Sequence, residues 1–442
     1  MTPAPPAPAR LILFTRWPAP GRAKTRLIPA LGPEGAAALH AALAQNALTW
    51  CLAYVRQHPA RLELRTDGAP PAAFRRWLGL APLIRPQGGG DLGQRMHQAM
   101  AEAFAEGEGR VALIGSDCPG LTDAILAQAF AELERHDLVL GPATDGGYYL
   151  IGLTRPAPAL FAGMSWGTGA VLAQTLAAAR RAGLDCALLP PLADLDRPDD
   201  LALWEAAPAP PRSSPPATGI SVVIPALNEA ANLAAAVTSA AVDGVEVIVV
   251  DGGSDDGTYR LARELGVGAV QGFRGRGRQQ NLGAALAQGE SLVFLHADSR
   301  LPAGWPEEVL RVLAPPGVSL GCFRFRLDHG GWQARLVERM VHLRTTLGQL
   351  PYGDQALFLP AGIFHALGGF AELPLLEDYD LVVRARRLGR VVQARLAAPT
   401  SGRRWRRLGL VRTTLINQAM LAGHALGVSP ERLARLYGAH RR

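Results

Sequence analysis

One short proline-rich segment divides this chain and limits how it can fold. Residues 207–219 contain five prolines and no residue suited to a hydrophobic core. A segment of this composition is typical of a semi-rigid linker. With 442 residues, 48% of them hydrophobic and 19% charged, the chain has enough apolar material for a core on each side of it. We therefore expect two domains, residues 1–206 and residues 220–442, joined by this linker.

Each side of the linker opens with an apolar strand, followed by a polar or glycine-bearing turn and then a helical pattern rich in Ala and Leu. The alternation continues through both halves. Strands are predicted at 11–14, 111–114, 138–140, 148–153, 220–224, 246–250, 291–295 and 320–327, and helices at 36–55, 94–105, 229–240 and 258–265. This order predicts two α/β domains with mostly parallel sheets. Since such sheets bind ligands at the carboxyl ends of their strands, acidic residues after the strands are candidate site residues.

Charge and cysteine content narrow the function class. The formal charge of +7 is spread thinly, and phosphate-bearing substrates or an acidic membrane surface explain it as well as nucleic acid, so no nucleic-acid partner is expected. The four cysteines lack CxxC spacing, which argues against structural zinc and disulfides and favours the cytoplasm. Residues 1–10 read as a Pro/Ala-rich tail and not a signal peptide. No uncharged run reaches the roughly 20 apolar residues of a membrane span, so membrane contact would be peripheral, at the inner face.

Polar motifs follow the predicted strands of the second half. They run Pro225-Ala226-Leu227-Asn228-Glu229, then Asp251 to Thr258, then Arg274 to Asn281, then His296-Ala297-Asp298, and finally Glu377-Asp378. A diphosphate leaving group needs a divalent cation held by a strand-end carboxylate with basic groups nearby, and Asp298 suits that role. Arg274, Arg276 and Arg278 stand among glycines that let the backbone approach phosphate. A carboxylate of the 377–378 pair suits a general base that accepts a proton from an acceptor hydroxyl.

This order of motifs resembles the family 2 glycosyltransferases of the GT-A fold across almost the whole second half. The resemblance implies a nucleotide-sugar donor, a small-molecule acceptor and a divalent metal, Mg²⁺ or Mn²⁺. It implies Asp378 as the general base, with Glu377 beside it. By the same resemblance the donor contacts Pro225, Asn228, Glu229, Asp251, Arg274, Arg278 and Gln279, the acceptor side includes Asp354, Gln355, Arg404 and Trp405, and the metal lies at Asp298 and His296.

Two departures from the family pattern bear on the chemistry. His296 replaces the first acidic residue of the metal-binding motif, so either metal affinity is weaker or the imidazole is a ligand. Ser401 stands where processive enzymes carry Gln, so a polymer product is not expected. The segments 272–281, 294–302 and 409–437 resemble bacterial selenodomain-associated transferases, also labelled arsenosugar biosynthesis glycosyltransferases. Some relatives carry a carotenoid-acid label, so a lipid or carotenoid-acid acceptor at a membrane stays an alternative.

Purely structural interpretations of the same motifs stay open. Asp251 to Asp256 and the 377–378 pair are also the residue types that cap helices and hold turns. The last forty residues hold nine arginines among apolar side chains. They form either an amphipathic segment on acidic lipid or a solvated helix that packs on the domain.

The first half carries its own phosphate-binding pattern. Lys24, the only lysine of the chain, follows the first strand and a glycine turn. A compact ammonium at a glycine turn is a common phosphate ligand. Asp117 and Asp196, at predicted strand ends, suit a shared divalent cation for nucleotidyl transfer. The sequence thus indicates Lys24 as a catalytic cation and Arg16, Gly21, Arg26 and Asp145 as binding residues for a nucleoside triphosphate.

These segments of the first half resemble a companion selenodomain-associated transferase family. That family is similar to small nucleotidyltransferases of the cofactor-guanylylating and molybdenum-cofactor kinds. The resemblance implies that the first half makes or binds the activated donor of the second, within one bifunctional chain. The alternative is a non-catalytic module that senses a nucleotide or docks a partner, because a fold does not fix a function.

Overall fold

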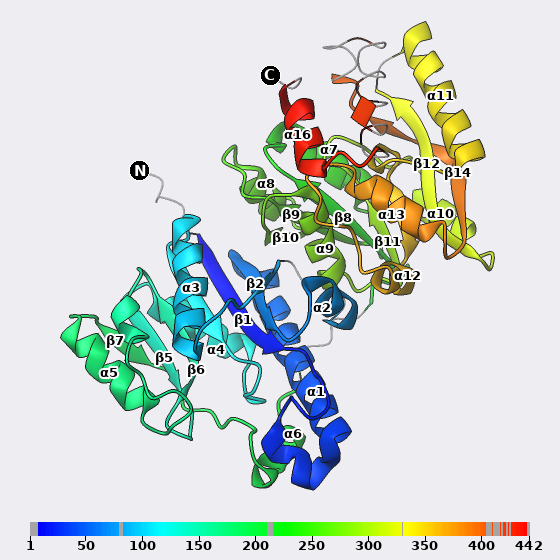
Figure 1. Cartoon of the computed structure of the whole chain (residues 1–442). Coiled ribbons are helices and arrows are strands. Elements are labelled where there is room, and N and C mark those ends of the chain that lie inside the picture. Colours follow the sequence, from blue (N-terminus) through cyan, green and yellow to red (C-terminus); the bar gives the residue numbers. More distant parts are fainter. Residues whose placement is uncertain are drawn as a thin grey trace. The chain divides into compact units, whose positions relative to one another are not determined.

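The computed structural model of the protein contains two compact units, Met1–Arg212 and Ser213–Arg442. Each unit is built around one seven-stranded sheet with helices packed on it (Figure 1). The structure describes residues 8–78, 83–209, 215–328, 330–403, 409, 416, 419–420, 423 and 426–439.

The sheet of the first unit has the strand order β3-β2-β1-β4-β6-β5-β7. Its strands are β1 (Ala9–Arg16), β2 (Ala60–Asp67), β3 (Ile84–Pro86), β4 (Arg110–Ile114), β5 (Leu138–Pro142), β6 (Tyr148–Leu153) and β7 (Cys186–Leu188). Strand β6 runs antiparallel to β4 and β5, and the other pairs are parallel. Its helices are η1 (Thr25–Leu27), α1 (Ile28–Gln57), α2 (Pro71–Leu78), α3 (Leu92–Ala105), α4 (Asp123–Glu132), η2 (Pro158–Leu160), α5 (Val171–Arg181), η3 (Pro198–Asp200) and α6 (Leu201–Glu205).

The second unit repeats this arrangement, with the strand order β10-β9-β8-β11-β13-β12-β14. Its strands are β8 (Ile220–Ala226), β9 (Glu246–Asp251), β10 (Gly268–Gln271), β11 (Ser291–Phe294), β12 (Val318–Leu327), β13 (Leu357–Pro360) and β14 (Arg390–Thr400). Strand β13 is antiparallel to its neighbours, as β6 is in the first unit. Its helices are α7 (Ala230–Ala240), α8 (Thr258–Glu264), α9 (Arg276–Leu286), α10 (Trp305–Leu313), α11 (Trp332–Gly348), η4 (Gly353–Gln355), α12 (Ala361–Ala366), α13 (Glu377–Ala385) and α16 (Pro430–Ala439).

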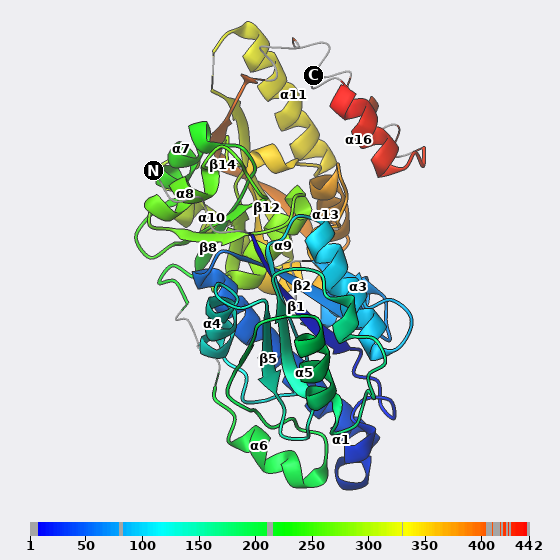
Figure 2. The same cartoon turned by 90° about the vertical axis from the view of Figure 1, so that its left-hand side faces the viewer.

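The expected fold class, two α/β domains with mostly parallel sheets, is confirmed. Apolar strands account for it, since all seven residues of β8 and seven of the eight residues of β1 are buried. Such strands need cover on both faces, which the helices supply. In the first unit α3 and α5 share a hydrophobic cluster with β1 and β4, while α4 lies on the other side of the strands (Figure 2).

The expectation of a tail up to Arg10 is wrong at its end, because Ala9 and Arg10 belong to β1. The Arg10 side chain is fully buried and lies 3.0 Å from Glu63 and 2.8 Å from Glu108. These carboxylates raise the pKa of Arg10 even though burial alone lowers it. A buried cation is tolerated in a strand when it is paired in this way.

The expectation that no segment could span a membrane also needs a correction. Among the described residues, the helical segment Thr25–Gln57, which is kinked at Gly32, is long and apolar enough to cross a bilayer, by length and composition only. Much of its apolar surface is used inside the first unit, where Leu43, Trp50 and Tyr54 are buried.

Candidate functional site

The loops after β8 and β9 meet in the second unit, because these strands are parallel neighbours. Asn228 has a φ of 54°, which turns the first loop toward the second. Its backbone N–H donates to Ser254 Oγ at 2.9 Å, and its side-chain oxygen accepts from the Asp255 N–H at 3.1 Å. The Glu229 N–H donates to Thr258 Oγ1 at 3.0 Å. The loops expected to hold the donor are therefore joined to each other.

Asp251 lies almost fully buried at the base of this loop pair, with 1% exposure. Its carboxylate accepts hydrogen bonds from the Gly253 N–H at 3.0 Å and from the backbone and hydroxyl of Ser254. Asp256 accepts from the Thr258 N–H at 3.0 Å, at the start of α8. The turn-holding interpretation therefore fits Asp256 fully. The Asp251 carboxylate is occupied by hydrogen bonds that fix the conformation of its own loop.

The basic stretch after β10 is partly neutralised. Arg276 lies 3.1 Å from Glu377, and Arg278 lies 3.1 Å from Glu372. Gln279 is buried and donates to the carbonyl oxygens of Ala226 and Val250 at 2.7 and 2.8 Å, which clamps the ends of β8 and β9. Pro225 lies within β8. Of the arginines expected to bind phosphate, Arg274 and Arg276 are exposed to solvent and Arg278 is half-buried.

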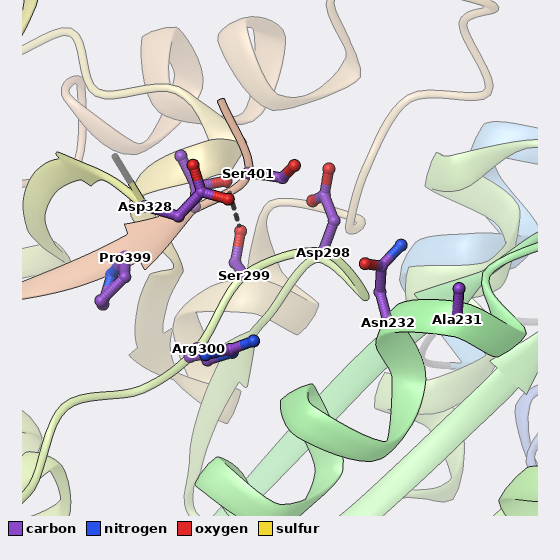
Figure 3. A pocket seen from close by; sticks show the side chains of 9 residues that line it. Ala231, Asn232, Asp298, Ser299, Arg300, Asp328, Pro399 and Ser401 are labelled. Carbon is purple, nitrogen blue, oxygen red and sulfur yellow. Dashed lines mark hydrogen bonds between the residues drawn. The ribbon is translucent and has the colours of Figure 1, made fainter. Parts of the chain in front are cut away.

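Asp298 lines a pocket of about 80 Å³ between the start of α7, the loop after β11 and the end of β14. In Figure 3 the Asp298 carboxylate lies between Asn232 and Ser401, and Asp328 lies beyond Ser401. Arg403 lies 3.4 Å from Asp298 and 3.2 Å from Glu229. The Asp298 carboxylate and the Asn232 amide thus line the pocket together. The Arg403 guanidinium links Asp298 to Glu229, and both are predicted site residues. A hydrogen bond of 2.7 Å between the hydroxyls of Ser299 and Thr400 joins two lining residues of the pocket.

Asp378 is fixed by two backbone groups at the start of α13. Its Oδ2 accepts from the Gly353 N–H at 2.6 Å, and its Oδ1 accepts from the Tyr379 N–H at 2.8 Å. A Cβ placed on Gly353 would lie 2.7 Å from His296 Nε2 and 3.1 Å from Asp378 Oδ2. The structure thus brings His296 and Asp378, which lie 82 positions apart in the sequence, to the same glycine.

His296 is held neutral, because burial, with a smaller contribution from Arg276, lowers its pKa well below the ordinary value. Its Nε2 atom is buried and accepts or donates no hydrogen bond among the described residues. A neutral imidazole with an unused nitrogen is able to bind a metal or a substrate hydroxyl.

Asp354 and Gln355 lie in η4, next to this group. Burial, with smaller contributions from Asp378 and Asp298, raises the pKa of Asp354 to about 6 against the opposing charge of Arg344. One Asp354 oxygen is buried without a hydrogen-bond partner among the described residues. Gln355 is buried, donates to the Phe323 carbonyl at 3.1 Å and accepts from Thr345 at 3.2 Å, which ties the loop to β12 and α11. A perturbed acid of this kind is a common mark of a functional site.

Burial likewise raises the pKa of Glu377, whose partner Arg276 opposes the shift. Glu377 is 3% exposed, so its carboxylate is not open to solvent and pairs with Arg276. Arg404 and Trp405, expected on the acceptor side, lie outside the described residues. Within the described ranges, no group of three or more His, Cys, Asp or Glu side chains is arranged to hold a metal ion.

The first unit brings Lys24, Asp117 and Asp196 together in one ion-pair cluster. The Lys24 Nζ lies 3.1 Å from Asp117 and 2.8 Å from Asp196, and it donates to the Leu195 carbonyl at 2.6 Å. The lysine side chain is 4% exposed, whereas the two carboxylates are 48% and 36% exposed. Burial alone lowers the pKa of Lys24, but the two carboxylates raise it overall. The ammonium therefore occupies the point that a shared metal ion would need.

Of the other predicted residues of the first half, Arg26 contacts this ion pair. Arg26 lies 3.3 Å from Asp196 and is 63% exposed. Gly21 has a φ of 75°, which glycine adopts without strain. Asp145 accepts from the Gly147 N–H at 2.8 Å, and Arg16 ends β1, where its carbonyl bonds to His40.

Several site residues were missed from the sequence. His40 is buried in α1 with its Nδ1 3.9 Å from Asp117, and burial lowers its pKa. Burial and then the charge of Asp145 raise the pKa of Asp194. Asn232 and Arg403 join Asp298 in the second unit. Only Asp194 had a signal, since it lies two residues before Asp196, whereas the others lie in helices or beyond the strand ends.

The two halves match two protein families. Residues 51–168 match a family described as an uncharacterised protein conserved in bacteria (DUF2064), and residues 221–371 match glycosyl transferase family 2. Among curated proteins, the chain is 31% identical over 139 residues to the glycosyltransferase AglE of Haloferax volcanii. That alignment covers 28% of this chain and 46% of AglE, so the chain spans less than half the length of this relative.

Two solved structures are similar to parts of the chain. One is a protein of Desulfovibrio desulfuricans G20, provisionally assigned as a nucleotide-diphospho-sugar transferase. It is 35% identical, with 43% of this chain and 82% of that chain covered and a TM-score of 0.40. The other is the mannosyltransferase PcManGT of Pyrobaculum calidifontis, solved with GDP-Man and Mn²⁺. It is 20% identical, with 43% and 59% covered and a TM-score of 0.36.

Proposed function

We propose that this chain, a DUF2064 domain of the nucleotide-diphospho-sugar transferase type followed by a glycosyl transferase family 2 domain, moves a sugar from a nucleotide donor to a small acceptor. The observation that carries the proposal is the meeting of Asp378 and His296 at Gly353. This places an oriented carboxylate beside an unpaired imidazole nitrogen, next to the residues that follow β11. Sugar transfer needs such an oriented proton acceptor.

The transfer step follows from these residues. The acceptor hydroxyl oxygen attacks the anomeric carbon of the donor, and the bond from that carbon to the diphosphate oxygen breaks. Asp378 accepts the hydroxyl proton, and the nucleoside diphosphate leaves with the bonding electrons. The two backbone N–H groups on Asp378 keep its carboxylate in one orientation, which contributes to rate by positioning.

Strained backbone supports the placement of the site. Among the described residues, the non-glycine positions with positive φ are Lys24, Asn228, Gln349, Ala356 and Leu376. Asn228 lies in the donor loop, the segment that follows β8. Ala356 follows the acceptor loop, Gly353–Gln355, and Leu376 precedes Glu377. Such conformations cost energy and cluster at functional sites.

The second unit suits a divalent cation that takes only one or two of its ligands from the protein. Asp298 is 31% exposed in its side chain and faces the pocket, so it is the residue that would hold the ion, with His296 as a second candidate. Bound Mg²⁺ usually takes one or two carboxylates and completes its shell with water and phosphate oxygens. When bound, the ion would neutralise the diphosphate leaving group.

For the first unit we propose a nucleotide-binding role centred on Lys24. Arg26, which is 63% exposed, suits a pyrophosphate group. The Lys24 ammonium already faces the Leu195 carbonyl, Asp117 and Asp196, so its part is to fix the loop that carries Arg26. Since Lys24 fills the space between Asp117 and Asp196, these residues do not fit a shared metal ion in this arrangement. Manufacture of the donor and its mere binding are separable, because only manufacture releases pyrophosphate from a nucleoside triphosphate and a sugar phosphate.

The proposal is tested with the full chain. Nucleotide sugars are screened for thermal stabilisation with Mg²⁺ or Mn²⁺, because a ligand of the folded state raises its stability by mass action. The stabilising donor is then incubated with alcohol acceptors, and release of the nucleoside diphosphate is measured. Stabilisation that disappears in Asp298→Ala, together with diphosphate release that disappears in Asp378→Asn, is the expected result. If no nucleotide sugar stabilises the protein and none is cleaved, sugar transfer is rejected.

A further inference from the structure

Helix α11 packs on the sheet through one narrow face. Ala334 and Val337 are buried against Phe325 and Leu327 of β12, and Thr345 is buried near its end. The helix lies at the edge of the second unit, beside β12 and β14 (Figure 1). One side of the helix is therefore fully used by the fold.

The opposite side carries a continuous stripe of large apolar side chains in solvent. Their exposed fractions run from 43% to 77%, which is unusual for so many large hydrophobic residues on one helix. They recur every three or four positions and so lie on one helical face. The stripe consists of Trp332 (72%), Leu336 (43%), Met340 (50%), Leu343 (58%) and Leu347 (77%).

Cationic side chains border this stripe on one flank. Arg335 and Arg339 are exposed and follow the same helical spacing, one position before Leu336 and Met340. The single acidic residue of α11, Glu338, turns back to the sheet, where it accepts from the Leu327 N–H at 3.0 Å. The solvent side of the helix is therefore apolar and basic, with no acidic side chain.

This pattern is the one that lies in the plane of an anionic bilayer. An apolar face with a tryptophan and a basic border enters the headgroup region, and its arginines meet acidic lipid. A second copy bound through the same face would place arginines against arginines, which opposes association. The chain's own last residues, 403–442, are also strongly basic, with nine arginines and one acidic residue, Glu431, and would be repelled in the same way.

We propose that the stripe of α11 docks the protein on an anionic lipid surface. The helix also contacts the acceptor loop, because Arg344 donates to Gln355 at 3.2 Å and its guanidinium lies 3.6 Å from the centre of the Tyr352 ring. Docking through α11 would thus set the acceptor loop close to the lipid surface. The proposal stands independently of sugar transfer, since it concerns binding alone.

The test is co-flotation of the full chain with vesicles of phosphatidylcholine alone or mixed with phosphatidylglycerol. We expect flotation only with the anionic vesicles and loss of it at high salt. The double substitution Leu343→Glu and Leu347→Glu removes two exposed apolar side chains and should weaken partitioning by at least about tenfold. Leu388→Glu, at a leucine that is 56% exposed outside the stripe, is the matched control and should float like the wild type.

Three results would overturn the proposal. The first is a wild-type chain that does not float with anionic vesicles. The second is a double variant that floats as well as the wild type while truncation after residue 403 abolishes flotation, which assigns the anchor to the tail. The third is a wild-type dimer in analytical ultracentrifugation that the double variant converts to a monomer without any vesicle binding, which assigns the stripe to a second copy. Circular dichroism of each variant verifies that it is folded.

Discussion

Asp378 and Gly353 are joined by a hydrogen bond of 2.6 Å from the glycine N–H to the carboxylate Oδ2. The glycine does more than donate this bond. Gly353 has no Cβ. The space that a Cβ would fill, between Asp378 and the unpaired Nε2 of His296, therefore stays open. The geometry of the proposed proton acceptor therefore depends on a residue that carries no chemistry of its own.

Asp378→Asn tests the proton acceptor directly. An amide keeps the shape of the side chain but cannot accept the acceptor proton, so kcat should fall by about 10²–10⁴. Thermal stabilisation by the nucleotide-sugar donor should persist, since the donor loops are formed by other strands. Glu264→Gln, at an exposed glutamate on α8, serves as the control with unchanged kcat. Equal kcat values for Asp378→Asn and the wild type would remove Asp378 from the mechanism.

Gly353→Ala tests the space beside Asp378. The new methyl group would lie 2.7 Å from His296 Nε2 and 3.1 Å from Asp378 Oδ2, which forces one of them to move. Because a misplacement of about 1 Å can cost about a hundredfold in rate, we expect a kcat loss of that order. Gly362→Ala, where a Cβ meets nothing within 4 Å, is the matched control and should retain activity. Full activity in Gly353→Ala would contradict the proposed geometry.

Asp354 should make stability depend on pH in a defined direction. Its pKa is raised to about 6 in the folded protein, so the folded state holds this proton more tightly than the unfolded chain. The resulting stabilisation is fully present below the unfolded pKa of about 3.9 and is lost as pH rises through about 6. For a partly exposed acid we expect the loss to be about 2 kcal/mol, after a discount for solvent.

Asp354→Asn removes this titration. Urea denaturation of both proteins across the same pH range gives the free energy of unfolding at each pH. The wild type should lose stability relative to Asp354→Asn as pH rises from about 4 to about 7. A constant difference between the two proteins over this range would show that Asp354 does not titrate there.

Lys24→Met tests whether the ammonium takes the place of a cation in the first unit. Removal of the charge leaves Asp117 and Asp196 facing each other, which should cost about 1–3 kcal/mol of stability. It also vacates the point where the two carboxylates meet, so Mg²⁺ should raise the melting temperature of Lys24→Met more than that of the wild type. Arg26→Met, which removes a neighbouring but exposed cation, should not respond to Mg²⁺ in this way. The same response to Mg²⁺ in all three proteins would contradict this interpretation.

The sequence was sufficient for the fold class because the central strands are continuous apolar runs. Strands such as β1, β4, β8 and β9 are buried on both faces, so composition alone marks them. Short strands at or near the sheet edges gave no comparable signal. β3 has three residues and β10 has four, and neither could be predicted. Arg10 misled the prediction because its charge is neutralised by Glu63 and Glu108, which are distant in sequence.

The candidate site was predictable only as far as residues follow strand ends directly. Asp117 and Asp298 follow this rule, three and four positions after the ends of β4 and β11. Asp196 does not, because it lies eight positions after the end of β7. His40 contributes from the middle of a helix, where a histidine reads as core. The ion pairs of Arg276 and Arg278 with Glu377 and Glu372 form across about a hundred positions, which no local pattern can indicate.

The repeated strand order has a consequence for how the protein is made. The last of the seven strands of the first sheet ends at Leu188, and the first strand of the second sheet begins at Ile220. During synthesis the first sheet is thus complete in sequence before any competing strand has left the ribosome. Tandem domains of like topology are prone to pair strands across domains when they refold together. The order of synthesis separates the two sheets in time, so nascent chains should reach the native pairing more reliably than chains refolded whole from denaturant.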